Sequence, residues 1–179
     1  MPSELIIHRE ASFLAVNKPA GIPVHGSRIL PGRPETLLSL VRQESGTIAH
    51  VVHRLDRPVS GVMLFALEKT ALTELGRSFE RRRARKTYLA VVRGWVDGSG
   101  LIDHSLPPPR DERQAGSPRR EAATRYRSIA TAEVPVPVSR YPAARYSLVA
   151  LEPLTGRRHQ LRRHMKHFSH HLVGDTSYG

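Results

Sequence analysis

The sequence has 179 residues and a hydrophobic fraction of 39%, enough for one domain with a sizeable core. Lys and Arg number 28 against 16 acidic residues, which gives a formal net charge of +12, and cysteine is absent. These values exclude disulfides and thiolate zinc sites, and no apolar run approaches the ~20 residues of a transmembrane helix. The basic excess favours a polyanionic partner, nucleic acid rather than an anionic membrane, because arginine predominates and aromatic residues are few. A basic protein without such a partner is the alternative, and we expect a cytoplasmic location.

The apolar pattern predicts strands in five segments, which in chain order are residues 13–19, 61–68, 87–95, 123–130 and 145–153. The run at 61–68 is almost continuously apolar, as in a strand that is buried on both faces. The segment at 123–130 alternates between polar and apolar residues, so one of its faces should be exposed to solvent.

Three segments between these strands have helical patterns, at residues 34–46, 69–86 and 156–168. The first has Pro34 at its start and Gly46 at its end, the usual asymmetry of a helix. The second should carry a basic run in its last turn and exit, where it complements the helix dipole. Strands mixed with few helices and no βαβ rhythm indicate an α+β fold with a largely antiparallel sheet.

Residues 107–120 contain four prolines and no hydrophobic residue larger than alanine. This composition is typical of a surface loop or a disordered insertion. A domain boundary there is possible, but strand patterns resume directly afterwards. We therefore expect one domain over residues 1–179 with a Pro/Arg-rich surface loop at about 107–120.

The segment HRLDRPVSG, residues 53–61, places Asp56 between Arg54 and Arg57 and leads into the most apolar predicted strand. A surface aspartate paired with arginine is the common interpretation of such a turn. The position at the mouth of the core suggests chemistry instead. An ionised carboxylate beside arginines can act as a base or nucleophile on a substrate that the arginines hold.

Two further segments have a structural and a functional interpretation. GRRHQLRRH, residues 156–164, is either a solvated basic face or an anion site. Tyr88 directly follows a basic run, and is either an ordinary strand aromatic or a platform for base stacking. The histidines near the C-terminus have no cysteine and only Asp175 close by, so we expect no metal site.

Five segments together resemble the RluA-type pseudouridine synthases. They occur in the order FLAVNKPAGIPVHG, HRLDRPVSGVMLFAL, RKTYLAVVRGW, TGRRHQLRRHM and LVGDTSYG. The resemblance implies the pseudouridine synthase fold, with a central RNA-binding cleft. It also implies an isomerisation that needs neither cofactor nor metal, in which uracil leaves ribose C1′, turns, and rejoins through C5.

The resemblance assigns roles to individual residues. Asp56 matches the catalytic aspartate, Tyr88 the aromatic residue that stacks on the target base, and Arg162 the arginine that pairs with that aspartate. Arg54 matches a side chain that enters the RNA stack where the uridine is flipped out, a step costing a few kcal/mol. We expect RNA to be bound by His53, Arg54, Arg57, Arg81, Arg82, Arg83, Arg85, Lys86, Arg157 and Arg158.

Within this family, residues 139–164 most resemble the members that modify uridine 65 of tRNA. A ribosomal RNA pseudouridine synthase and a truncated, non-catalytic RNA-binding module remain the alternatives. Members usually continue beyond the GDxxYG segment, so we expect the fold to lack its C-terminal strands. We further expect a monomer that binds RNA and no membrane.

Overall fold

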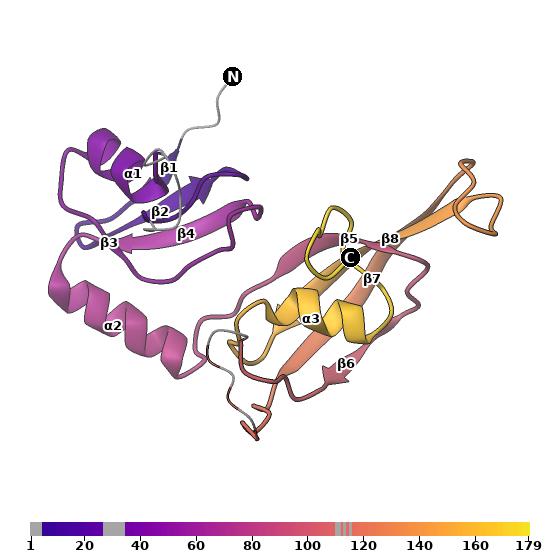
Figure 1. Cartoon of the computed structure of the whole chain (residues 1–179). Helices are drawn as coiled ribbons and strands as arrows, with labels where there is room; N and C mark the ends of the chain where they lie inside the picture. Colours follow the sequence, from indigo (N-terminus) through magenta and orange to yellow (C-terminus); the bar gives the residue numbers. More distant parts are fainter. Residues whose placement is uncertain (1–4, 27–34, 110–111, 113, 115) are drawn as a thin grey trace. The chain divides into compact units, whose positions relative to one another are not determined.

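A computed structural model describes residues 5–26, 35–109, 112, 114 and 116–179 of the chain. The chain divides into two compact units, residues 1–84 and 85–179 (Figure 1). Each unit has its own four-stranded antiparallel sheet, where the sequence analysis expected one sheet. The organisation of residues 1–179 as one domain stays a prediction.

The first sheet has the strand order β1-β2-β4-β3. Its strands are β1 (Ile6–Arg9), β2 (Phe13–Lys18), β3 (His50–Val51) and β4 (Gly61–Ala66). Leu14 and Val16 of β2 lie opposite Phe65 and Met63 of β4, and all four side chains are fully buried on one face. The expectation that residues 61–68 are buried on both faces is wrong at Val62, which is 57% exposed. An antiparallel sheet needs only one covered face, and this strand has an antiparallel partner on each side.

Two helices accompany this sheet. Helix α1 (Leu37–Ser45) begins with a capping box between Thr36 and Ser39, and it ends at Gly46 in the left-handed conformation. Pro34, the predicted start, lies outside the described residues. Helix α2 (Lys69–Glu80) is shorter than the predicted 69–86. Arg82 has a φ of 58°, so the basic run follows the helix and does not form its last turn.

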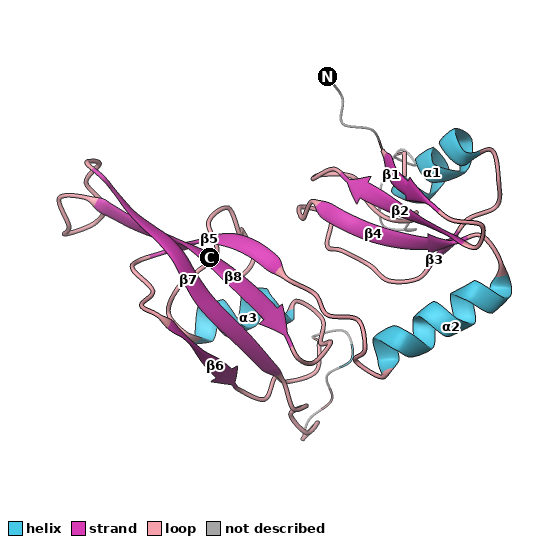
Figure 2. Cartoon of the chain, turned by 180° about the vertical axis from the view of Figure 1, so that it is seen from behind, coloured by secondary structure: helices cyan, strands magenta, loops and turns pink. Residues whose placement is uncertain are grey.

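The second sheet has the strand order β5-β8-β7-β6 (Figure 2). Its strands are β5 (Tyr88–Arg93), β6 (Ser99–Asp103), β7 (Ala123–Val134) and β8 (Ala144–Pro153). Helix α3 (Gln160–His167) lies on one face of this sheet in both views (Figures 1 and 2). The core between them consists of Val92, Val96, Ile102, Val149, Leu151 and Met165. The predicted helix 156–168 begins late because His159 has a φ of 54°.

Strand β7 alternates as predicted at its start. Thr124 is buried, and Tyr126 packs against Phe168 at the end of α3, whereas Arg125 and Arg127 are exposed. An irregularity between Ser128 and Ala130 then shifts the register, and Ile129 is 43% exposed.

The Pro/Arg-rich segment is an excursion within the second unit. Leu106 and Arg120 form an isolated β-bridge at its base, and β6 on one side pairs with β7 on the other. The interpretation of residues 107–120 as a surface loop stays a prediction. Residues 110, 111, 113 and 115 of the segment lie outside the described residues. None of the helices among the described residues combines the length and apolar character that a membrane span requires.

Candidate active site

A buried lysine anchors the loop that carries Asp56. Lys18, the last residue of β2, is fully buried, and its Nζ donates to the backbone oxygens of Pro19 (2.9 Å), Arg57 (3.0 Å) and Val59 (2.7 Å). Burial lowers the pKa of Lys18, and the charge of Asp56 partly counters that effect. The ammonium therefore fixes the backbone on both sides of Pro58 and contributes positive charge near the Asp56 carboxylate.

The loop itself is a tight turn. The backbone oxygen of Asp56 accepts a hydrogen bond from Val59 N (3.0 Å). The backbone oxygen of Arg57 accepts from Gly21 N, and Arg57 Nε donates to Gly21 O, both at 2.8 Å. Gly61, with a φ of 136°, then starts β4. Arg57, expected to bind RNA, thus has a structural contact, and its RNA contact stays a prediction.

His53 connects the same loop to the rest of its unit. Its Nε2 accepts a hydrogen bond from Leu64 N at 3.1 Å, so a neutral ring carries its proton on Nδ1. The ring stacks on Phe79 of α2, with centroids 4.5 Å apart. These contacts hold the His53 ring within its unit, and its RNA contact stays a prediction. Arg54 and Arg57 are exposed, and Asp56 is half-buried.

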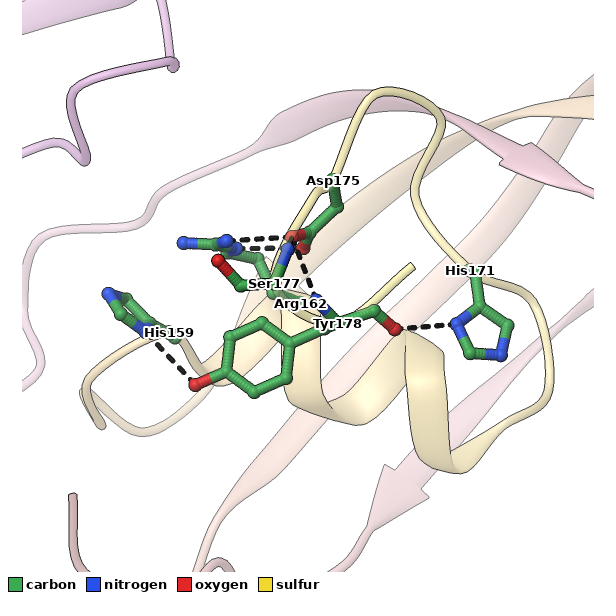
Figure 3. Close-up of polar contacts among 6 residues, drawn as sticks. All are labelled: His159, Arg162, His171, Asp175, Ser177 and Tyr178. Atoms are coloured by element: carbon green, nitrogen blue, oxygen red, sulfur yellow. Dashed lines mark hydrogen bonds and ion pairs between the residues drawn. The ribbon is translucent and has the colours of Figure 1, made fainter. Parts of the chain in front are cut away.

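In the second unit, Arg162 of α3 is held by an acid near the C-terminal end of the chain (Figure 3). Asp175 accepts hydrogen bonds from Arg162 Nε (2.8 Å) and from one terminal nitrogen (2.7 Å). Its Oδ1 also accepts from the backbone N–H groups of Ser177 (2.9 Å) and Tyr178 (3.1 Å). The Asp175 side chain is 5% exposed, and the hydrogen bond from Arg162 is the main cause that lowers its pKa to about 2.

Tyr178 completes this arrangement. The guanidinium carbon of Arg162 lies 4.9 Å from the centre of the Tyr178 ring, a cation–π contact. The Tyr178 hydroxyl is 3.1 Å from His159 Nδ1, and His171 Nδ1 donates to Tyr178 O at 2.6 Å (Figure 3). The loop after α3 therefore fixes the orientation of the Arg162 guanidinium from one side.

The other predicted site residues occupy defined places. Tyr88 is the first residue of β5, is half-buried, and pairs with Leu151 of β8. Arg157 donates through Nε to Glu121 O (3.0 Å), and Arg158 is exposed. The residues Arg81, Arg82, Arg83 and Arg85 are exposed, and Lys86 is half-buried. The meeting of Asp56 with Tyr88 and Arg162, which belong to different units, stays a prediction.

The model of the RNA pseudouridylate synthase family matches residues 12–167, most of the chain. The chain belongs to the RNA pseudouridylate synthase family. This confirms the resemblance, and the α+β fold with antiparallel sheets and three helices agrees with it.

Curated relatives in this family carry a more specific name. A tRNA pseudouridine synthase C of Pectobacterium carotovorum subsp. carotovorum is 45% identical over 179 residues, which cover 97% of this chain and 48% of that protein. The protein of the same name from Pasteurella multocida (strain Pm70) is 44% identical, with 97% and 74% covered. The chain thus spans about half the length of the first relative.

Two solved structures of family members are similar to the chain. Human RNA Pseudouridylate Synthase Domain Containing 1 has a TM-score of 0.79 and 28% identity, and the match covers 100% of this chain and 72% of that one. Human RNA Pseudouridylate Synthase Domain Containing 4 has a TM-score of 0.70 and 25% identity, with 97% and 68% covered.

Lys18 and Asp175, which hold candidate site residues in place, are not among the predicted residues. Lys18 ends an apolar strand and is fully buried. A lysine in such a run is the sequence signal for a buried charge, which needs hydrogen-bond partners. Asp175 was noted only as a neighbour of histidines, although it is the acid that binds Arg162. In the described part of the chain, no group of three or more His, Asp or Glu residues is placed to hold a metal ion.

Proposed function

We propose that this chain is a tRNA pseudouridine synthase that converts one uridine, at position 65 by the likeness of residues 139–164, to pseudouridine. The family membership and the printed names of the relatives support this substrate. We place the activity in the cytoplasm, with tRNA. The anchored Asp56 turn, held by the buried Lys18, is the observation that carries the proposal.

The reaction breaks the bond between uracil N1 and ribose C1′ and forms a bond between C5 and C1′. C5 loses its hydrogen as a proton, N1 gains one, and no electrons are exchanged with another molecule. Asp56 either attacks as a nucleophile or removes a ribose proton, and both routes require a carboxylate at a fixed place. A turn locked by Lys18 and Gly21 provides that rigidity.

The remaining residues bind the RNA and position the target uridine. By the resemblance to the family, Tyr88 stacks on the target base, Arg162 takes the role of the arginine that pairs with the catalytic aspartate, and Arg54 fills the space that the flipped uridine leaves. The exposed arginines 81–83 and 85 neutralise phosphates of the RNA backbone.

Asp56→Asn tests this assignment, because the amide can neither attack nor accept the ribose proton. We expect the rate of tritium release from tRNA labelled at uracil C5 to fall at least roughly a hundredfold. The Kd for tRNA should stay within about twofold, since a neutral amide of equal size removes no phosphate contact. Asp97→Asn, which changes an exposed acid, is the matched control and should keep full activity.

Two results would contradict the proposal. Substantial activity of Asp56→Asn would remove Asp56 from the chemistry. Product formed only in ribosomal RNA by the unmodified protein would replace the tRNA substrate.

A further inference from the structure

Four basic side chains meet at one corner of the second unit, away from the residues assigned above. His104, which follows β6, stacks on His167 of α3 with ring centroids 3.5 Å apart and an interplanar angle of 15°. A terminal nitrogen of Arg119 lies 2.7 Å from His104 Nε2, and Arg163 of α3 donates to Pro107 O at 2.8 Å.

The protonation state of His104 follows from these contacts. A guanidinium only donates, so Nε2 of His104 accepts and the neutral ring carries its proton on Nδ1. Burial lowers the pKa of His104, and the charges of His167, Arg119 and Arg163 lower it further. The guanidinium groups of Arg119 and Arg163 are thus two fixed cations that act on the His104 ring. Arg119 and His167 are exposed, so the cluster is open to solvent.

A buried polar chain fixes the floor of this corner. His164 of α3 is fully buried, and its Nε2 donates to His104 O at 3.0 Å. Its Nδ1 then accepts from the Thr124 hydroxyl at 2.9 Å, and Thr124 in turn accepts from Gln160 Nε2 at 3.0 Å. Burial lowers the pKa of His164, which agrees with a neutral ring. The corner is thus preorganised by β7 and α3.

We propose that His104, Arg119, Arg163 and His167 form a binding site for one phosphodiester group of the RNA. The guanidinium groups of Arg119 and Arg163 match the geometry of a phosphate, and its negative charge would balance these two positive charges. The site rests on the proposed function only in taking RNA as the partner. Because Arg163 follows Arg162 on α3, a phosphate bound there fixes the RNA backbone relative to the helix that carries Arg162.

The test measures the Kd of the full chain for an unmodified tRNA transcript over a series of salt concentrations. Arg119→Gln should lower the slope of log K against log salt by about one phosphate contact. At physiological salt the Kd should rise about three- to fivefold, the size of an exposed ion pair. Arg127→Gln is the matched control, because it removes one exposed charge from β7 on the sheet face opposite α3.

Each outcome decides the proposal. The proposal is overturned if the slope for Arg119→Gln is unchanged, or if Arg127→Gln changes the slope equally. It is also overturned if polyglutamate, a polyanion without phosphates, displaces the tRNA equally well from the unmodified protein and from Arg119→Gln. If thermal unfolding shows that Arg119→Gln disrupts the unit, Arg119→Lys and Arg163→Gln take its place. A retained slope for Arg119→Lys and a lowered slope for Arg163→Gln support the site, and the reverse results refute it. Tritium release from the same samples separates the two proposals. If the salt slopes are as expected but no pseudouridine is formed, only the proposed activity is refuted. If pseudouridine is formed but Arg119→Gln leaves the salt slope unchanged, only the phosphate site is refuted.

Discussion

Asp175 shows how one residue sets the state of another. Its carboxylate accepts hydrogen bonds from two nitrogens of Arg162 and from two backbone N–H groups, and the Asp175 side chain is almost fully buried. The Arg162–Asp175 pair is thereby formally neutral and rigid. If Arg162 acts on the Asp56 carboxylate, its direction is determined by Asp175 and by the ring of Tyr178.

Asp175→Asn should therefore destabilise the second unit in a pH-dependent way. The pKa of Asp175 is about 2 in the folded protein against an ordinary value of 3.8. Its contribution, about 2 kcal/mol, is complete above pH 3.8 and is lost as the pH falls toward about 2. Urea unfolding of both proteins between pH 7 and pH 2 checks this. A stability difference that does not shrink below pH 4 would argue against the ion pair as its source.

At the scale of elements, the Asp56 turn is fastened to β2, because Lys18, the last residue of β2, donates to the backbone oxygens of Arg57 and Val59 in the turn. Lys18→Met keeps the volume but removes the ammonium donor from three carbonyl oxygens, of which Arg57 O keeps the Gly21 N–H. We expect a loss of about 2–4 kcal/mol in unfolding free energy and a lower rate of pseudouridine formation. Lys69→Met, at the exposed start of α2, should change stability by less than about 0.5 kcal/mol. Equal behaviour of the two variants in urea unfolding would show that Lys18 does not anchor the turn.

The sequence predicted elements well where periodicity is strong. The strands at 13–18 and 88–93 and the body of α1 follow from apolar runs and from the Gly46 cap. The short strands β1, β3 and β6 were missed, because they contain two to five residues and few buried side chains. The end of α2, before Arg82, and the start of α3, after His159, depend on left-handed backbone at these two residues. Arginine and histidine do not predict that conformation.

The candidate site was only partly predictable for a related reason. Asp56 stands out because its neighbours in sequence are cations. Lys18 and Asp175 gain their roles from partners far away in the chain, at Arg57 and Val59 and at Arg162. Such pairings depend on tertiary structure, which local patterns do not contain.

At the scale of the whole molecule, the positive charge is uneven. Residues 85–179 contain 16 Lys and Arg against 8 Asp and Glu, so the second unit holds 8 of the 12 net charges. This unit also carries Tyr88 and Arg162, whereas Asp56 belongs to the first. The second unit therefore contributes most of the long-range attraction that the chain can exert on a polyanion.

The proposal tested most directly is that Asp56 and Arg162 serve the same reaction, as the resemblance to the family implies. The chain contains no cysteine, so the pair Asp56→Cys and Arg162→Cys can be treated with a short bifunctional maleimide. We expect an intramolecular crosslink between positions 56 and 162, detected by mass spectrometry of the digested protein. The single variants Asp56→Cys and Arg162→Cys, which each carry one thiol, are the controls and should give no intramolecular crosslink. A folded double variant that fails to link 56 to 162 would contradict the account.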